Sequence, residues 1–241
     1  MPKQYAVIVA GGKGLRMGGD IPKQFVPLCG EPVLMHTIKK FSSCSEIILV
    51  LPSEQLAYWA ELCQTYKFDY PHKVVCGGET RYHSVYSGLQ ALAELGISED
   101  DLVAVHDGVR PLVATTLIEE CYRVAAQTGA ALPYRPLVNS LRKFEGSEVT
   151  HAVERSDYVT VHTPQVFRLA PLMKAYERGY KSSFTDDASV WEDSGESAPS
   201  LVLSNAENIK LTTPIDLKLA ELFFTDLYYR CPLYLLLILL I

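Results

Sequence analysis

The sequence lacks several features that mark particular classes of protein. Lysine and arginine number 22 against 28 acidic residues, so the net charge is −6 and no overall positive charge is available for a nucleic-acid backbone. None of the 6 cysteines forms a CxxC pair or a cysteine–histidine cluster with zinc spacing, so free thiols in a reducing compartment are expected. The first residues run directly into an apolar segment, so we expect no signal peptide and a cytoplasmic location.

A long apolar run is also missing, although the C-terminal end is strongly apolar. Residues 232–241 read PLYLLLILLI, whereas a membrane-spanning helix needs roughly 20 apolar residues. We therefore expect no membrane partner and one domain over residues 1–228, followed by a tail of unknown role at 229–241. A docking segment, an interface element and a cloning or frameshift artefact all fit this tail.

What the sequence does contain is an alternation of short apolar runs with helical patterns. Strands are expected at 5–10, 46–51, 73–76, 101–106, 130–133 and 200–204, and helices at 32–41, 54–66, 81–95, 115–127, 170–179, 186–194 and 214–228. This order predicts an α/β fold, a Rossmann-like three-layer sandwich with a mostly parallel central sheet. Residues 137–160 break the alternation around Gly146 and predict a projecting two-stranded β-arm.

A glycine-rich loop follows the first expected strand and reads Ala10-Gly11-Gly12-Lys13-Gly14-Leu15-Arg16-Met17-Gly18. Glycines there let backbone N–H groups approach phosphate oxygens, although the loop matches neither the Walker loop nor the dinucleotide fingerprint. Lys13, Arg16 and Lys23 lie in or just beyond the loop. Fixed cations stabilise the charge that a triphosphate gains in the transition state, so a nucleoside triphosphate site is indicated. A basic, solvated turn is the competing interpretation.

The pattern Gly-Gly-x-Gly-x-Arg-Met followed by Pro22-Lys23-Gln24 resembles the opening of the sugar-nucleotide pyrophosphorylase-like nucleotidyltransferases. Its Pro-Lys-Gln form is similar to the cytidylyltransferases that act on 2-C-methyl-D-erythritol 4-phosphate in the non-mevalonate isoprenoid pathway. The resemblance extends to about residue 225 and makes 1–228 a single nucleotidyltransferase domain. It implies that CTP and 2-C-methyl-D-erythritol 4-phosphate give 4-diphosphocytidyl-2-C-methyl-D-erythritol and pyrophosphate, with Mg²⁺ as the cofactor.

The same resemblance implies roles for individual residues of the loop and of the later Asn208-Ile209-Lys210 motif. The nucleotide phosphates would be bound by Ala10, Gly11, Gly12, Lys13 and Gly14. The catalytic cations would be Arg16, Lys23 and Lys210.

The block from Gly77 to Ser84 is implied to bind the cytosine base through Gly78, Glu79 and Ser84. Cytosine needs an acceptor for its amino group and donors for N3 and O2, and a backbone-rich loop supplies both. The residues by themselves also fit a plain helix start with Thr80 as the N-cap, and the two interpretations are compatible.

The segment His106-Asp107-Gly108-Val109-Arg110-Pro111 follows the fourth expected strand. A carboxylate at the carboxyl end of a central strand suits a hard cation, which prefers oxygen ligands. The resemblance implies that Asp107 binds the nucleotide and the metal and helps to orient the acceptor, and that Arg110 helps to hold the acceptor phosphate. A turn role for Asp107 is the alternative, and His106 is expected to be structural.

The acceptor side is implied to draw on later segments. Ser140 and Arg155 of the arm would reach into the site of a partner subunit and contact the acceptor phosphate, which implies a homodimer with shared sites. Thr163, in Thr163-Pro164-Gln165, would close the acceptor side. The stretch from Thr185 to Ser189 is interpreted as a helix start with Thr185 as its N-cap.

Three other functions stay open. Ribitol 5-phosphate cytidylyltransferases share the Pro-Lys-Gln-Phe and His-Asp-x-Val-Arg-Pro blocks, although the Thr185–Ser189 stretch favours the methylerythritol enzymes. A guanylyl- or uridylyltransferase of the same fold and a non-catalytic nucleotide-binding module are the other two. No Ser-His-Asp arrangement or catalytic cysteine is visible, which favours catalysis by positioning and charge neutralisation.

Overall fold

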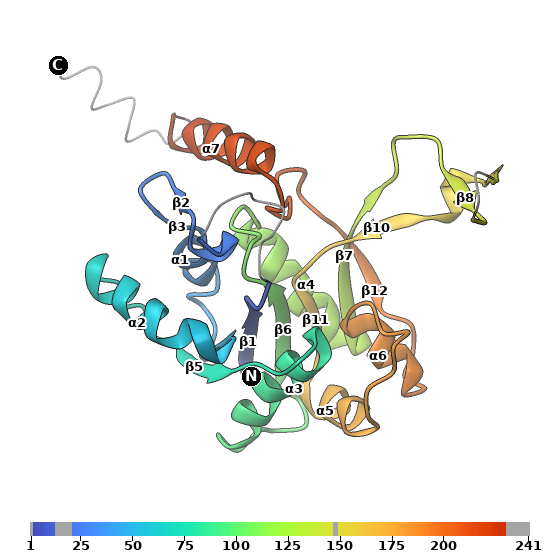
Figure 1. Cartoon of the computed structure of the whole chain (residues 1–241). Helices are drawn as coiled ribbons and strands as arrows, with labels where there is room; N and C mark the ends of the chain where they lie inside the picture. The colour runs from blue at the N-terminus through green and yellow to red at the C-terminus, as the bar shows by residue number, and fades with distance from the viewer. Residues whose placement is uncertain (1, 13–20, 147–148, 230–241) are drawn as a thin grey trace.

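A mixed sheet forms the centre of the protein in this computed structural model, which describes residues 2–12, 21–146 and 149–229. The sheet has eight strands in the order β10-β7-β11-β6-β1-β4-β5, and β12 also pairs with β7 (Figure 1). Its strands are β1 (Gln4–Val9), β4 (Glu46–Leu51), β5 (Lys73–Cys76), β6 (Leu102–Asp107), β7 (Ala130–Pro136), β10 (Val159–Val161), β11 (Gln165–Arg168) and β12 (Ser200–Leu203).

Helices separate most of these strands along the chain. They are α1 (Val33–Lys39), α2 (Leu56–Thr65), α3 (Arg81–Ala93), α4 (Thr115–Thr128), α5 (Leu169–Glu177), α6 (Asp187–Asp193) and α7 (Pro214–Tyr229). Short 3-10 turns occur at η2 (Lys23–Phe25), η3 (Ser53–Gln55) and η4 (Arg155–Asp157), and β2 (Pro27–Leu28) pairs with β3 (Glu31–Pro32). The α/β order expected from the sequence is confirmed. Within the described part of the chain, no helix is both long enough and apolar enough to cross a membrane.

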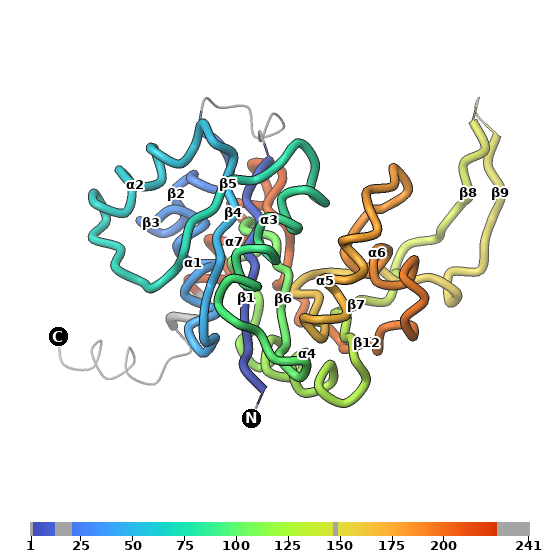
Figure 2. Tube along the Cα trace, turned by 90° about the horizontal axis from the view of Figure 1, so that it is seen from below, coloured from blue at the N-terminus to red at the C-terminus, as the bar shows by residue number. Residues whose placement is uncertain are grey.

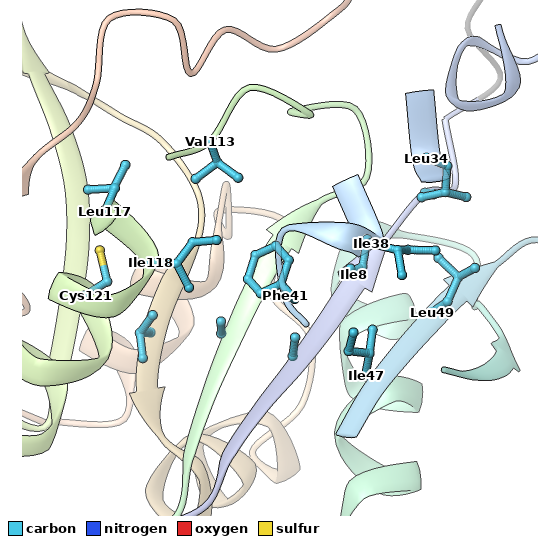
Figure 3. Close-up of a cluster of buried hydrophobic side chains, with 14 of the residues drawn as sticks. Ile8, Leu34, Ile38, Phe41, Ile47, Leu49, Val113, Leu117, Ile118 and Cys121 are labelled. Carbon is cyan, nitrogen blue, oxygen red and sulfur yellow. The ribbon is translucent and has the colours of Figure 1, made fainter. Parts of the chain in front are cut away.

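The strands alternate their side chains between two apolar layers, and this alternation produces the three-layer arrangement. Ala6 and Ile8 of β1 belong to a buried cluster with α1, α2 and α4, whereas Tyr5 and Val7 belong to a cluster with α3, α5 and α6. Figure 3 shows the first cluster, where the strand residues Ile8, Ile47 and Leu49 meet side chains of α1. Strands buried on both faces need continuous apolar runs, which is why the sequence pattern located them.

The strand β11 was not expected from the sequence. It lies between β6 and β7 and is antiparallel to both, whereas β1 runs parallel to β4 and β6. Val166 and Phe167 are fully buried, but they form too short an apolar run to predict a strand. The effect of β11 is to bring Thr163 and Gln165 to the middle of the sheet.

The predicted β-arm is present as a separate two-stranded sheet. β8 (Arg142–Phe144) pairs antiparallel with β9 (Thr150–Ala152), and Gly146 after β8 has a φ of +83°. Both views show the arm extending away from the central sheet (Figures 1 and 2). Apolar side chains on it are left exposed, including Val138 at 83% and Phe144 at 69%.

Helix α3, which begins beside the candidate site, lies unusually close to the sheet at Gly88. A Cβ atom at this position would lie 2.5 Å from Cγ1 of Val7 and 3.1 Å from Cγ2 of Val50. The glycine therefore allows α3 to approach β1 and β4 so closely.

Gly88→Val should lower the free energy of unfolding by about 1–3 kcal/mol, because its added methyl groups overlap buried strand side chains. Urea unfolding followed by circular dichroism measures the change. Gln90→Val is the matched control, since Gln90 is exposed on the same helix. An equal effect of the two substitutions would contradict close packing at Gly88.

Candidate active site

A cavity of about 320 Å³ opens at the carboxyl ends of the parallel strands. Residues from β1, β4 and β6, from the loop between β5 and α3, and from the segment before α7 line it. The predicted site residues that it brings together are Ala10, Gly11, Gly12, Lys23, Gly78, Glu79, Ser84, Asp107 and Lys210. Lys13, Gly14 and Arg16 lie outside the described residues, so their predicted roles stay predictions.

The turn η2 carries Lys23 to the end of β1. Gln24 is fully buried, and its Nε2 donates to the carbonyl of Ala10 at 2.8 Å and to Oε1 of Gln55 at 2.6 Å. These bonds fix η2 against the end of the strand. A Cβ atom at Gly12 would lie 3.2 Å from Cε and 3.7 Å from Nζ of Lys23, so the amine is held directly beside the glycine backbone.

The loop before α3 is held by its own side chains. Thr80 is the N-cap of α3 and accepts from the backbone N–H of His83, as the sequence indicated. The Ser84 hydroxyl accepts from the N–H of Gly78 at 3.2 Å and lies 3.0 Å from the carbonyl of Thr80, to which it donates. Gly78 and Glu79 are exposed and line the cavity, and both polar backbone groups of Gly78 are within hydrogen-bond distance of the Ser84 hydroxyl.

The Asp107 carboxylate lies at the end of β6 among cationic side chains. Its Oδ2 is 2.9 Å from Nζ of Lys210 and 3.2 Å from Nε of Arg110. Its Oδ1 lies 3.9 Å from Nε of Arg81, which is too far for a hydrogen bond. Burial alone would raise the pKa of Asp107, but Lys210, Arg81 and Arg110 lower it more strongly, so the carboxylate stays ionised.

The buried hydroxyl of Thr163 fixes the backbone of Asp107. The Thr163 hydroxyl accepts from the Asp107 N–H at 3.1 Å and lies 3.0 Å from Nδ1 of His106. The carbonyl of Arg110, 3.2 Å from Nε2 of His106, can only accept, so Nε2 of the neutral ring carries the proton and Nδ1 accepts from the Thr163 hydroxyl. Burial lowers the pKa of His106 to about 3, which keeps the ring neutral and is consistent with the expected structural role. Thr163 is buried behind Asp107 and is not among the residues that line the cavity.

The other residues predicted to bind the acceptor substrate lie partly beside Asp107 and partly on the arm. Arg110 is buried, and its Nη1 donates to the carbonyl of Asn208 at 2.9 Å, which ties the Asn208-Ile209-Lys210 motif to the end of β6. Ser140 and Arg155 lie exposed on the arm and do not line the cavity of their own chain. Arg155 donates to the carbonyl of Val138 within the arm at 2.5 Å.

The side chains at the cavity suit a metal ion that is held mainly by the phosphates of a bound substrate. In the described parts of the chain, no three His, Cys, Asp or Glu side chains gather closely enough to hold a metal ion. Asp107 lines the cavity, and its Oδ1 has no hydrogen-bond partner among these residues. Mg²⁺ is often bound by one or two carboxylates together with substrate phosphates, so a single open carboxylate oxygen fits it.

The sequence reasoning missed the link between Arg81 and Asp187. Arg81 Nη1 and Nη2 donate to Oδ1 and Oδ2 of Asp187 at 2.9 and 2.5 Å. Arg81 is the first residue of α3, where a cation opposes the helix dipole, and that unfavourable placement was a signal of another partner.

The prediction that Thr185 is the N-cap of α6 was wrong. The cap of α6 is Asp186, which forms a reciprocal capping box with Ser189.

Comparisons with known proteins agree on one family. The family model described as IspD, 2-C-methyl-D-erythritol 4-phosphate cytidylyltransferase, matches residues 4–226. Proteins of that name from Porphyromonas gingivalis and Phocaeicola vulgatus are 52% and 51% identical, over 93% and 90% of this chain and 99% and 98% of theirs. A crystal structure of 4-diphosphocytidyl-2C-methyl-D-erythritol synthase from Anaerococcus prevotii has a TM-score of 0.78 at 26% identity, covering 93% of this chain and 96% of that one. The Thermus thermophilus cytidylyltransferase structure has a TM-score of 0.73 at 30% identity, with 92% and 98% covered.

The buried histidine predicts how stability depends on pH. The folded-state pKa of His106 is about 3 against an ordinary value of 6.5, so between these values the unfolded chain binds a proton that the folded chain excludes. Its contribution to stability is therefore complete above the higher value and is lost as the pH falls toward the lower one. Between pH 7 and 5 this loss amounts to about 2 kcal/mol.

His106→Gln should reduce the loss of stability between pH 7 and 5 by that amount, measured as the difference between urea unfolding curves. His151→Gln, at an exposed arm position, should leave the pH dependence as in the wild type. If the wild type and His106→Gln have parallel pH profiles, His106 is not excluded from protonation in the folded state.

Proposed function

This chain belongs to the 2-C-methyl-D-erythritol 4-phosphate cytidylyltransferase family, and from that premise we propose that the cavity beside Asp107 is its active site. The enzyme converts CTP and 2-C-methyl-D-erythritol 4-phosphate to 4-diphosphocytidyl-2-C-methyl-D-erythritol and pyrophosphate, in isoprenoid biosynthesis. One observation carries the assignment of the site. Lys23, Asp107 and Lys210 are far apart in the sequence and line one cavity at the carboxyl end of the sheet.

The reaction is an in-line displacement at phosphorus. An oxygen of the acceptor's phosphate monoester forms a bond to the α-phosphorus of CTP, while the bond from that phosphorus to the bridging oxygen of pyrophosphate breaks. The second pKa of a phosphate monoester is near 6, so the nucleophile is already ionised at neutral pH and needs no strong general base. The protein therefore acts by positioning and by stabilising negative charge.

Two of the predicted catalytic cations, Lys23 and Lys210, line the cavity and would act on the phosphates. The Lys23 amine lies beside the Gly12 backbone, where it would contact the α-phosphoryl group as its charge increases. Lys210 is held 2.9 Å from Asp107 Oδ2, which orients its amine before any substrate binds. Arg16 is proposed as a further stabilising cation on the strength of the sequence motif alone.

Magnesium is proposed to bind at Oδ1 of Asp107 together with the phosphates of CTP. When bound there, the ion would neutralise charge on the pyrophosphate leaving group. The three cations near Asp107 keep the carboxylate ionised, which is the form that a metal requires. The cytosine base would lie against the loop at Gly78 and Glu79, whose backbone is fixed by the Ser84 hydroxyl.

A homodimer through the arm is proposed to complete each site. Ser140 and Arg155 do not line the cavity of their own chain, which supports the proposal that they contact the acceptor in the site of a partner. The arm and the adjoining β10 also leave apolar side chains exposed, as an uncovered interface would. These are Val138, Phe144, Val149, Tyr158, Val159 and Val161. A cytoplasmic location is proposed with this activity.

Lys23→Ala should slow pyrophosphate release from CTP and 2-C-methyl-D-erythritol 4-phosphate by about 10²–10³-fold, the usual cost of removing one group that stabilises transition-state charge. The assay couples pyrophosphate release to a colour reaction, and circular dichroism checks the fold. Lys174→Ala, at an exposed position of α5, is the control. Wild-type protein should be active with this acceptor and inactive with ribitol 5-phosphate. Turnover of Lys23→Ala at the wild-type rate would remove Lys23 from the mechanism.

Mixing two inactive variants tests whether sites are shared between subunits. Lys23→Ala and Arg155→Ala, unfolded and refolded together, should regain about a quarter of wild-type activity, because random pairing makes half of the dimers mixed and each mixed dimer holds one intact site. Each variant refolded alone should stay inactive. If Arg155 acts within its own chain, the mixture should remain as inactive as its components.

A further inference from the structure

The two oxygens of the Asp107 carboxylate differ in their contacts with cationic side chains. Oδ2 contacts both Lys210 and Arg110, at 2.9 and 3.2 Å. Among the described residues, the ion-pair contact of Oδ1 is with Nε of Arg81, at 3.9 Å. Arg81 also lines the cavity, with about a third of its side chain exposed (31%). The guanidinium is therefore close enough that a small displacement would bring it onto Oδ1.

A second carboxylate prevents this displacement. Asp187 accepts both terminal nitrogens of Arg81, one on each oxygen, in the two-pronged geometry that Arg–carboxylate pairs prefer. Asp187 has no exposed surface and is itself fixed, because the Tyr176 hydroxyl donates to its Oδ1 at 2.6 Å. Its backbone N–H donates to Oε1 of Gln165 at 3.1 Å. Asp187, which anchors Arg81, is thus more buried than the competing Asp107.

Asp107 and Asp187 compete for the Arg81 guanidinium, and the outcome affects the binding of a divalent ion. If Arg81 paired with Oδ1, both oxygens of Asp107 would carry bonds to protein cations. A divalent ion would then have to displace a guanidinium before it could coordinate this carboxylate. As the structure stands, Arg81 adds positive potential to the cavity without occupying the open oxygen.

We propose that Asp187 is a positioning residue that holds the Arg81 guanidinium away from Asp107, so that Oδ1 stays open to the magnesium–nucleotide. The proposal deepens the proposed function and rests on it, since it takes this cavity as the CTP site. Asp187 itself does not line the cavity, and its effect on the ligand passes entirely through Arg81.

The first test is Asp187→Asn, which keeps the size of the side chain and removes the charge that retains Arg81. The Mg²⁺ concentration that gives half-maximal CTP binding should rise roughly tenfold, equivalent to about 1.4 kcal/mol. Isothermal titration calorimetry with CTP and no acceptor measures this value without turnover. Replacing the competing cation as well, in Arg81→Gln/Asp187→Asn, should return the Mg²⁺ requirement to within about twofold of the wild type.

A third variant separates positioning from stability. Arg81→Lys/Asp187→Asn and Arg81→Gln/Asp187→Asn both remove the Arg81–Asp187 ion pair, and residue 81 keeps a positive charge only in the first. The Lys variant should need more Mg²⁺ than the Gln variant, although thermal unfolding should show similar stability. This comparison decides the question even if Asp187→Asn alone does not fold. Asp193 is on α6, like Asp187, and forms an exposed ion pair with Lys181. Asp193→Asn is therefore the control for the carboxylate-to-amide exchange.

The proposal is overturned if the two double variants have the same Mg²⁺ requirement, or if the requirement of Asp187→Asn equals that of the wild type. Wild-type turnover is measured in parallel with 2-C-methyl-D-erythritol 4-phosphate as the acceptor. Failure to release pyrophosphate there would count against the proposed function. The binding comparison between the variants would still decide the role of Asp187.

Discussion

The Asp107 carboxylate stays ionised with only a tenth of its side chain exposed, because Lys210, Arg110 and Arg81 surround it. An isolated charge at such a depth would be neutralised by a proton, and the cations without the carboxylate would repel one another. Each cation comes from a different segment: the turn after β6, the segment before α7, and the start of α3. The carboxylate therefore joins three parts of the chain, and the shape of the cavity depends on that junction.

The polar groups behind Asp107 explain why it has one fixed position. Its N–H is bonded to Thr163, which is bonded to a neutral His106, whose other ring nitrogen is bonded to the carbonyl of Arg110. Every member of this chain is buried, and losing one would leave a neighbour unpaired. Thr163 fixes the backbone of Asp107 through this chain even though it does not line the cavity. The antiparallel strand β11, which follows Thr163, is therefore part of the site's support.

Much of the fold could be predicted from the sequence because strands buried on both faces leave uninterrupted apolar runs. The bounds expected for the buried strand β4 agree with the structure, and β7 was located but is longer than expected. The bounds of β5 also agree, although this edge strand is mostly exposed. The loops after β1, β5 and β6 could be expected to meet, because the carboxyl ends of parallel strands lie at one edge of a sheet. The roles of single residues in them, and the place of Lys210, were implied only by the family resemblance. The contact between Arg81 and Asp187 could not, because they are separated by 106 positions and meet only through the packing of α3 and α6 on one face of the sheet.

The pair between buried Asp187 and partly exposed Arg81 is poorly explained as a source of stability. Taking the Asp187 charge out of water costs about as much as the attraction between the two charges returns. What the pair does provide is a fixed position for one cation near a second carboxylate. Tyr176 and Gln165 restrain Asp187 from either side, so the geometry is specified more strictly than an ion pair alone would need. Such strict placement is expected where a guanidinium must stay a set distance from a reactive group, here 3.9 Å from Asp107 Oδ1.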